Sequence, residues 1–221
     1  MRIQLKLSKN NEIVPFNYRE TIVSKLHYWL GKNNLHDYPS LYGFSSLQNG
    51  KLTAKGINFL YETSFYISSH DDTVISKIIN AIQVNNDFGY GMKIQEIQFV
   101  SNPIFDDKPQ RFLLNSPVFI KRTIDNKKIH YTFKNDESSI LLTESLITKM
   151  NFAKIKLDPS LKIYFDKSYP NPKEKLIEYK GIKNKCSLCP IIIEGKPETK
   201  QFAYDVGIGN SSGIGFGFLN I

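Results

Sequence analysis

The sequence predicts an α+β fold of two tandem ferredoxin-like β-α-β-β-α-β units with antiparallel sheets, ending in a glycine-rich loop. Three observations predict it. Strand-like and helix-like periodicities follow one another in that order twice along the 221 residues, and a hydrophobic content of 41% is enough for a core in each unit. Glycines are also concentrated near the end of the chain. We expect an N-terminal domain at 1–110 and a C-terminal domain at 111–221.

The first unit is predicted from two kinds of periodicity. Residues 3–8 alternate apolar and polar side chains, which is typical of a half-buried strand, and residues 18–30 carry apolar side chains at helical spacing. The remaining elements are expected to be, in order, strands at 41–47 and 62–69 joined by a hairpin containing Asn49-Gly50, a helix capped by Asp71 or Asp72, and a strand over 93–105.

The second unit reads as an approximate copy of the first, with its last helix eroded. Residues 106–115 break both periods and are expected to separate the units. The elements predicted after this break are strands at 116–123 and 128–135, a helix after Ser138 or Ser139, strand candidates at 161–166, 175–182 and 189–195, a poorly patterned segment at 197–207, and a terminal strand after the glycines.

The positive charge is concentrated in the second half of the chain. The net charge is +8; residues 1–110 hold 11 Lys/Arg against 10 Asp/Glu, whereas residues 111–221 hold 18 against 11. This distribution favours a polyanion as partner of the second half, although a Lys-, Asn- and Ile-rich composition could also produce it as a solubility charge. No long apolar run and no secretory signal are present, so we expect a cytoplasmic protein without membrane contact.

Cys186 and Cys189 form a single C-x-x-C. This is half of a zinc site at most, because no second Cys or His pair lies at metal-binding spacing. A redox pair is the alternative, but nothing nearby resembles a redox βα element. We expect a tight hairpin turn with two unreactive thiols, and neither a metal nor a cofactor.

The glycine-rich stretch offers two interpretations. Glycine accepts positive φ and lets another backbone or a phosphate come close, and the amides of the small polar residues between the glycines could cradle phosphate oxygens. A tight crossing against a sheet, where any Cβ would clash, is the structural alternative. The residues concerned are Gly207, Gly209, Asn210, Ser211, Ser212, Gly213, Gly215 and Gly217.

The G-x-G-x5-G-F-G spacing of this stretch resembles the glycine-rich loop of the CRISPR-associated endoribonucleases that cut repeat RNA into guides. Three dispersed segments match that family's pattern in the right order, namely Leu35-His36-Asp37, Tyr42-Gly43-Phe44-Ser45 and Ser116-Pro117-Val118. The resemblance implies the tandem ferredoxin-like (RRM-like) architecture and binding to RNA.

The resemblance also implies a reaction in which the RNA's own 2′-hydroxyl attacks the adjacent phosphate, giving a 2′,3′-cyclic phosphate without a metal. His36 would transfer the proton, Tyr28 or its neighbour His27 would assist, and Lys51 would supply the cation by proximity. The family's lysine is missing from residues 40–42. Judged by residue type alone, His36 reads as a surface residue and Tyr28 as a packing residue.

The basic residues of the second half are expected to contact RNA phosphates. They are Lys121, Arg122, Lys127 and Lys128, together with Lys180, Lys183 and Lys185 around the C-x-x-C. The implied partners are precursor repeat RNA, the processed guide and an effector complex, with the protein a monomer or homodimer. Two alternatives remain: a non-catalytic RNA-binding subunit of such a complex, and a nucleotide-binding enzyme.

Overall fold

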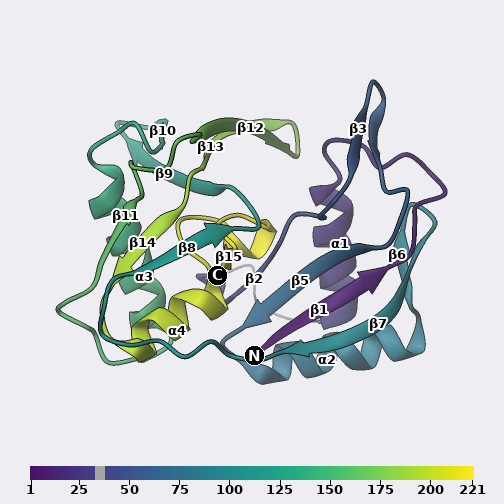
Figure 1. Cartoon of the computed structure of the whole chain (residues 1–221), viewed down its shortest axis with the longest axis horizontal. Coiled ribbons are helices and arrows are strands. Elements are labelled where there is room, and N and C mark those ends of the chain that lie inside the picture. Colours follow the sequence, from purple (N-terminus) through teal and green to yellow (C-terminus); the bar gives the residue numbers. More distant parts are fainter. Residues whose placement is uncertain (33–37) are drawn as a thin grey trace.

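The computed structural model of the chain describes residues 1–32 and 38–221. The chain forms two halves that lie side by side, the first in purple and blue and the second in green and yellow (Figure 1). The sheets are antiparallel and helices occur in both halves, so the predicted α+β class is confirmed. The histidine singled out in the sequence, His36, lies outside the described residues.

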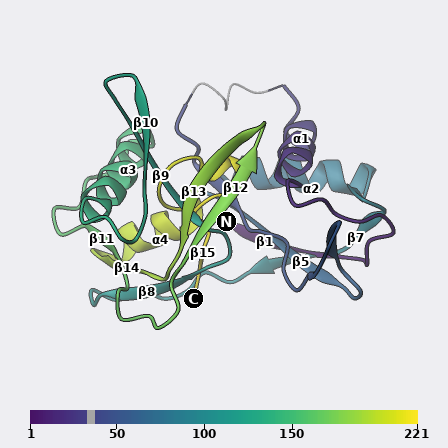
Figure 2. The same cartoon turned by 90° about the horizontal axis from the view of Figure 1, so that it is seen from above.

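The first half is built on one five-stranded sheet in the order β2-β5-β1-β7-β6. Helices α1 and α2 cover one face of this sheet and leave the other open (Figure 2). The elements of this half are β1 (Arg2–Leu7), α1 (Arg19–Leu30), β2 (Tyr42–Phe44), β3 (Lys51–Thr53), β4 (Gly56–Asn58), β5 (Thr63–Ser69), α2 (Asp72–Val84), β6 (Asp87–Gly89) and β7 (Met92–Val100).

Most of the elements predicted for the first half are present. The Asp71 carboxylate caps α2 by accepting from the Thr73 amide at 2.9 Å, and the helix buries one apolar face. The predicted hairpin is more elaborate than expected: β2 pairs with β5, but the connection between them forms its own hairpin of β3 and β4. This extra hairpin projects from the top of the molecule in Figure 1.

The second half divides its strands between two four-stranded sheets, β10-β9-β13-β12 and β11-β14-β8-β15. Its elements are β8 (Gln110–Leu114), β9 (Val118–Ile124), β10 (Lys127–Tyr131), α3 (Ser138–Phe152), β11 (Lys162–Phe165), β12 (Lys173–Tyr179), β13 (Ile182–Leu188), β14 (Ile191–Glu194), α4 (Pro197–Val206), the 3₁₀ turn η1 (Ser212–Ile214) and β15 (Leu219–Asn220).

Three predictions for the elements of this half are wrong. The single strand expected at 175–182 is interrupted by the Lys180–Gly181 turn, which joins β12 to β13. The segment 106–115, expected to carry no element, contains β8, a central strand of its sheet. The last helix, expected to be eroded, is the ten-residue α4. If β8, α3, β11, β14, α4 and β15 are read in order, the sheet places its second, third, first and fourth strands side by side, as β2-β5-β1-β7 does. The β9–β10 and β12–β13 hairpins are insertions into that order.

The buried hydrophobic residues form two main clusters. One is drawn from residues 3–94 and the other from residues 112–219, and a small third cluster contains Phe119, Cys186 and Phe216. Each half therefore has a core of its own. No helix in the described part of the chain is both long and apolar enough to cross a membrane.

Candidate functional site

The glycine-rich segment, residues 207–217, is packed between the two halves, where η1 contacts α1 and β2. A Cβ at Gly209 would lie 2.6 Å from the Phe119 carbonyl oxygen, and one at Gly207 would lie 2.9 Å from that of Gly217. The tight crossing that the sequence offered as a structural alternative is therefore present at these positions. Only Asn210, Ser211 and Ile214 keep partial exposure.

Two buried arginines of the first half donate hydrogen bonds to backbone carbonyls in and beside this segment. Arg19, the first residue of α1, donates to the Gly215 carbonyl and to the Ser46 hydroxyl at 3.1 Å. Arg2 donates to the Leu219 carbonyl at 2.9 Å, and its guanidinium lies 3.3 Å from the centre of the Tyr204 ring. Burial lowers the pKa of Arg2 to about 10 and also lowers that of Arg19.

A buried lysine approaches the same segment from the second half. Lys149 lies in the last turn of α3, and its ammonium donates to the carbonyls of Val206 at 3.1 Å and Gly207 at 2.9 Å, and to Ser212 Oγ at 3.0 Å. Burial alone lowers the pKa of this ammonium to about 7. The lysine thus ties α3 to the start and the middle of the glycine-rich segment.

These three cations make the surroundings of the segment electropositive. In the part of the chain that the structure describes, none of the three forms an ion pair with an acidic side chain; Asp205 acts on Arg2 only through a weaker attraction. Backbone carbonyl dipoles solvate these charges without neutralising them. A buried charge is screened less than a surface charge, so an anion nearby is favoured.

A hollow of about 340 Å³, which we call the loop pocket, opens beside the segment. Its wall combines the glycine-rich segment, the end of α3 and the chain entering β2. The lining residues are Pro39, Ser40, Arg122, Ser145, Thr148, Lys149, Gly209, Asn210, Ser211 and Ser212. The pocket therefore collects residues from both halves around the most exposed part of the segment.

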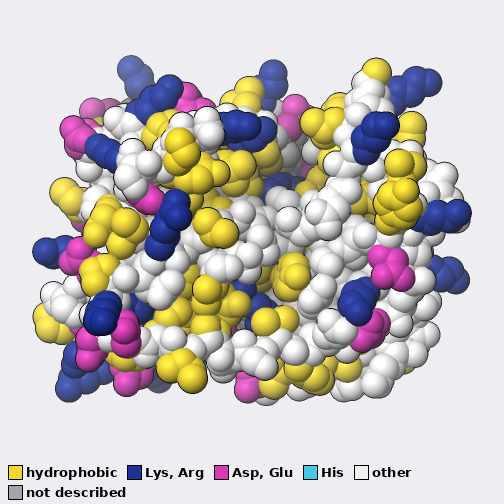
Figure 3. Space-filling view, viewed as in Figure 1, with side chains coloured by type: hydrophobic (Ala, Val, Ile, Leu, Met, Phe, Trp, Pro, Cys, Tyr) yellow, Lys and Arg dark blue, Asp and Glu magenta, His cyan; other side chains and the backbone are white. Residues whose placement is uncertain are grey.

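A wider cleft of about 720 Å³ lies between the β3–β4 and β12–β13 hairpins. Figure 3 shows it as the hollow at the upper centre of the molecule, with hydrophobic and basic side chains on its rims. Arg19 lies in its wall, Phe16 and Leu52 line one side, and Lys175 and Leu176 line the other.

The structure separates two of the predicted catalytic residues. Tyr28 lies exposed in the last turn of α1, with the Lys25 ammonium 6.0 Å from its ring centre. Lys51 opens the β3–β4 hairpin, which pairs with the segment just before α1 through a bridge between Val14 and Ile57. Tyr28 is thus roughly 13 Å along the helix from the end beside the hairpin. With His36 outside the described residues, the catalytic assignments stay predictions.

The predicted RNA-binding lysines occupy the inserted hairpins. Lys127 and Lys128 are exposed at the start of β10, after a turn formed by Asp125 and Asn126, both with positive φ. Lys121 on β9 is half-buried, and its amide donates to Asn210 Oδ1 at 2.7 Å. This bond connects the basic hairpin to the glycine-rich segment.

The remaining basic positions differ in their surroundings. Arg122 reaches the loop pocket but also pairs with Glu144 at 3.0 Å. Lys180 forms the turn of the β12–β13 hairpin with Gly181, and its amide donates to the Glu20 carboxylate of α1 at 2.7 Å. Phosphate contacts by all these residues remain predictions.

The cysteines are not at a hairpin turn, contrary to expectation. Cys186 lies within β13 and Cys189 follows that strand; both are buried. Burial raises the pKa of Cys186 to about 12 and that of Cys189 to about 11, so both thiols stay protonated and unreactive near neutral pH. Within residues 1–32 and 38–221, no three His, Cys, Asp or Glu side chains gather as metal ligands.

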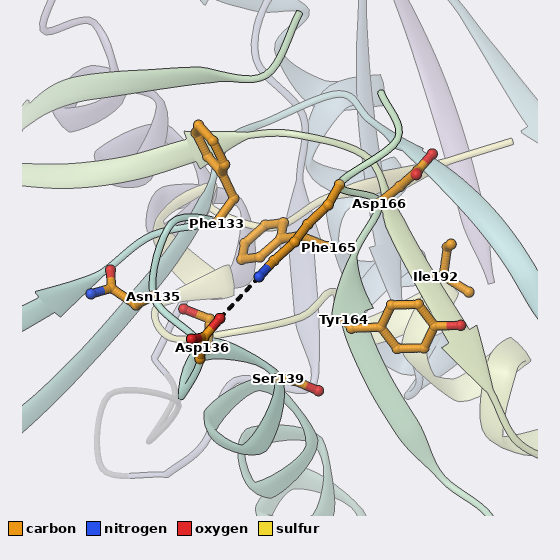
Figure 4. A pocket seen from close by; sticks show the side chains of 10 residues that line it. Phe133, Asn135, Asp136, Ser139, Tyr164, Phe165, Asp166 and Ile192 are labelled. Carbon is orange, nitrogen blue, oxygen red and sulfur yellow. Dashed lines mark hydrogen bonds and ion pairs between the residues drawn. The ribbon is translucent and has the colours of Figure 1, made fainter. Parts of the chain in front are cut away.

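Another hollow of about 340 Å³ lies at the far end of the second half. Figure 4 shows Phe133, Tyr164 and Phe165 around it, with Asp136 in a dashed ion pair. That pair joins the Asp136 carboxylate to Lys167 at 3.0 Å. Because its lysine has an acidic partner and Asp166 also lines it, this hollow does not favour an anion as the loop pocket does.

The family of the chain follows from comparison with known proteins. The family model described as CRISPR associated protein Cas6, C-terminal, matches residues 100–221, which is more than half of the sequence. The chain therefore belongs to the Cas6 family of CRISPR-associated proteins.

Individual relatives match along the whole chain. A Pyrococcus horikoshii protein, whose name describes it as CRISPR-associated and endoribonuclease-like (Cas6nc), is 27% identical and covers 100% of this chain and 99% of its own. The structure of a Cas6-related protein from Pyrococcus furiosus has a TM-score of 0.85 at 23% identity, covering 100% of this chain and 98% of that one. A RAMP protein described as binding different RNA substrates gives 0.84 at 23%, with the same coverage.

Proposed function

We propose that this protein binds CRISPR repeat RNA and cleaves the precursor transcript into guides by attack of the RNA's own 2′-hydroxyl, giving a 2′,3′-cyclic phosphate and a 5′-hydroxyl. Its two halves act as tandem ferredoxin-like units, with the glycine-rich loop held between them. The processed guide and a CRISPR effector complex are the expected partners.

One observation carries this proposal. In a Cas6-family chain, two buried cations, Arg19 and Lys149, contact the glycine-rich segment from opposite halves, and neither forms an ion pair with an acidic side chain of the described residues. Arg2 adds a third buried charge beside the segment, at Tyr204 and Leu219. Such an arrangement stabilises an anion that approaches the seam between the halves. Exposed lysines of the β9–β10 hairpin extend the same charge outward.

The proton transfers are assigned to His36, with Tyr28 as its assistant. An imidazole has an unperturbed pKa of about 6.5 and exchanges protons near neutral pH. Loss of such a group removes a contribution of roughly 10²–10⁴-fold to the rate. Lys51 is the weakest assignment, because its hairpin lies beside the opposite end of α1 from Tyr28.

The test is cleavage of repeat RNA in EDTA, followed by identification of the end groups. A cyclic phosphate is expected from the wild-type protein. H36A should lose cleavage and keep RNA affinity, while H70A serves as a matched control because His70 packs against Phe202 in a different part of the molecule. Cleavage that survives H36A would overturn the assignment of the catalytic residue.

The second candidate is a non-catalytic RNA-binding subunit. The distance between Lys51 and Tyr28 along α1 favours this non-catalytic role. The name of the Pyrococcus horikoshii relative, which is given only as endoribonuclease-like, favours it too. In that case the wild-type protein binds repeat RNA and leaves it intact. The cleavage assay separates the two functions directly.

A further inference from the structure

We propose that the loop pocket and the neighbouring aromatic pair Tyr38–Phe152 form a single-nucleotide subsite, in which the pocket takes a phosphodiester and the aromatic pair takes the adjacent base of single-stranded RNA. This inference rests on the proposed function, because it specifies where the RNA is held. The sequence had singled out Arg122 and residues 209–212 of the pocket, and the structure adds Tyr38, Phe152 and Lys149.

The aromatic pair is placed for stacking. The rings of Tyr38 and Phe152 are 5.2 Å apart at 20° to each other, and the two residues are 55% and 41% exposed. An exposed aromatic surface of this kind offers a face to an unpaired base, and each stacked base contributes to binding with little sequence preference.

The pair stands at the edge of the loop pocket. Tyr38 directly precedes Pro39 and Ser40, which line the pocket. Phe152 lies three residues after Lys149 and four after Thr148, so all three side chains project from the same face of α3. A base stacked on the aromatic pair and a phosphate in the pocket would therefore belong to adjacent parts of one RNA strand.

The pocket offers backbone donors for the phosphate. Ser211 is left-handed, with φ 63° and ψ 37°, and is followed by the right-handed turn η1. This succession points consecutive amides into one concavity, which is a common anion-binding arrangement. In the part of the chain that the structure describes, the amides of Ser211 and Ser212, which both line the pocket, have no hydrogen-bond acceptor.

Two cations complete the pocket in different ways. The guanidinium of Arg122 donates to the Glu144 carboxylate and to two backbone carbonyls. Its remaining N–H groups are left for a phosphate oxygen in the pocket. The Lys149 ammonium donates all three of its hydrogens, to Val206, Gly207 and Ser212. It therefore positions the segment from behind, and its charge adds to the positive potential in the pocket.

The combination selects the occupant. An inorganic anion would use the amides and Arg122 but not the aromatic pair, and a duplex would keep its bases stacked internally. A nucleotide within a single strand satisfies both features at once. The hollow in Figure 4 lacks this combination, because the positive charge of Lys167 is neutralised by its ion pair with Asp136.

The experiment measures stacking and affinity separately. A short single-stranded repeat RNA carrying one 2-aminopurine is scanned along its length; we expect one position at which binding quenches the fluorescence. F152L and Y38L should abolish that quench and weaken binding about ten-fold. F99L, at a still more exposed phenylalanine on β7, is the control and should do neither.

The phosphate half of the subsite is tested with R122Q. Affinity should fall several-fold and the salt dependence should become shallower by about one phosphate contact. K167A removes a lysine with an ion pair of the same 3.0 Å length and should leave both unchanged. Thermal unfolding of every variant confirms that it is folded.

The outcomes are distinct. If the wild-type protein does not bind the RNA, the proposed function fails. If it binds but F152L, Y38L and R122Q bind and quench like the controls, only the subsite is overturned. Tight binding of a mononucleotide that the RNA does not displace would also overturn it, because the pocket would then serve a free nucleotide.

Discussion

The two halves of the protein share a strand order but use it differently. In the first half, β2-β5-β1-β7 is one sheet with two helices on one face, and a short β3–β4 hairpin is inserted between β2 and β5. The second half inserts the β9–β10 and β12–β13 hairpins, which form a four-stranded sheet of their own. These hairpins, residues 118–131 and 173–188, hold nine of the 18 Lys/Arg of residues 111–221, whose net charge is +7 against +1 for residues 1–110. The second half therefore carries an additional, basic sheet.

The seam between the halves shows how they depend on each other. Arg2 and Arg19 of the first half donate to carbonyls of the second, and the glycines allow the two backbones to approach closely enough for these bonds. The comparison therefore shows that each half forms its core from its own sheet and helices, while the glycines and the buried arginines join the two halves. Four substitutions test this division.

The largest effect is expected from G217A. Gly217 has φ +64° and its Cβ would meet the backbone of Ile208, so the segment would have to leave the seam. We expect the free energy of unfolding, measured with urea, to fall by at least about 3 kcal/mol. The control is G181A, where φ is +72° but nothing lies within 4 Å; it should cost about 1 kcal/mol. Equal losses would show that backbone strain alone matters.

R19M should come next in size. Methionine fills much of the same volume but leaves the Gly215 carbonyl and the Ser46 hydroxyl without their donor. Stability should fall by about 2–4 kcal/mol. K6M removes a surface pair with Glu96 and should change stability far less than R19M does, because solvent screens an exposed ion pair. Similar values for the two variants would contradict a seam held by buried charge.

The double variant K127A/K128A should leave stability unchanged and act on RNA alone. Each lysine that contacts a phosphate contributes about 0.7–0.9 to the slope of log affinity against log salt. The slope for repeat RNA should therefore fall by about 1.5, as measured by anisotropy at several salt concentrations. K77A, at an exposed lysine of α2 in the first half, should not change it.

The smallest effect concerns pH and Lys149. Burial lowers the pKa of Lys149 from its ordinary value of 10.5 to about 7 in the folded protein, so between these two pH values the unfolded chain binds a proton that the folded chain does not. Stability from this group therefore rises with pH above about 7 and is lowest in acid. The urea midpoint of the wild type should increase from pH 7 to 8.5, and K149M should lose that increase. An identical rise in both would exclude Lys149 as its source.

The sequence predicted correctly those elements whose apolar residues recur at regular spacing. The alternation in residues 3–8 and the apolar face of α2 were confirmed as β1 and as a capped helix. β8 was missed because its five residues, QRFLL, show no alternation. The α4 helix was underestimated because its buried face includes Lys200 and Asp205.

The charged part of the site was the hardest to predict. Arg19 and Lys149 stand in amphipathic helices where a charged residue ordinarily reads as exposed, and only the close approach of the glycine-rich segment buries them. The glycines themselves signalled that approach, but not which side of the segment it would occupy. The order of its contacts depends on residues nearly 200 positions apart, which no local pattern reports.

The position of the glycine-rich segment along the chain has a consequence for synthesis. It follows every strand except β15, yet it supplies the Gly215 carbonyl to Arg19, a residue that leaves the ribosome near the start of synthesis. The first core can form early, but the contact of Arg19 with this segment exists only after translation has passed residue 215. A chain that stops before the segment would therefore lack the Arg19 and Lys149 contacts that join the two halves.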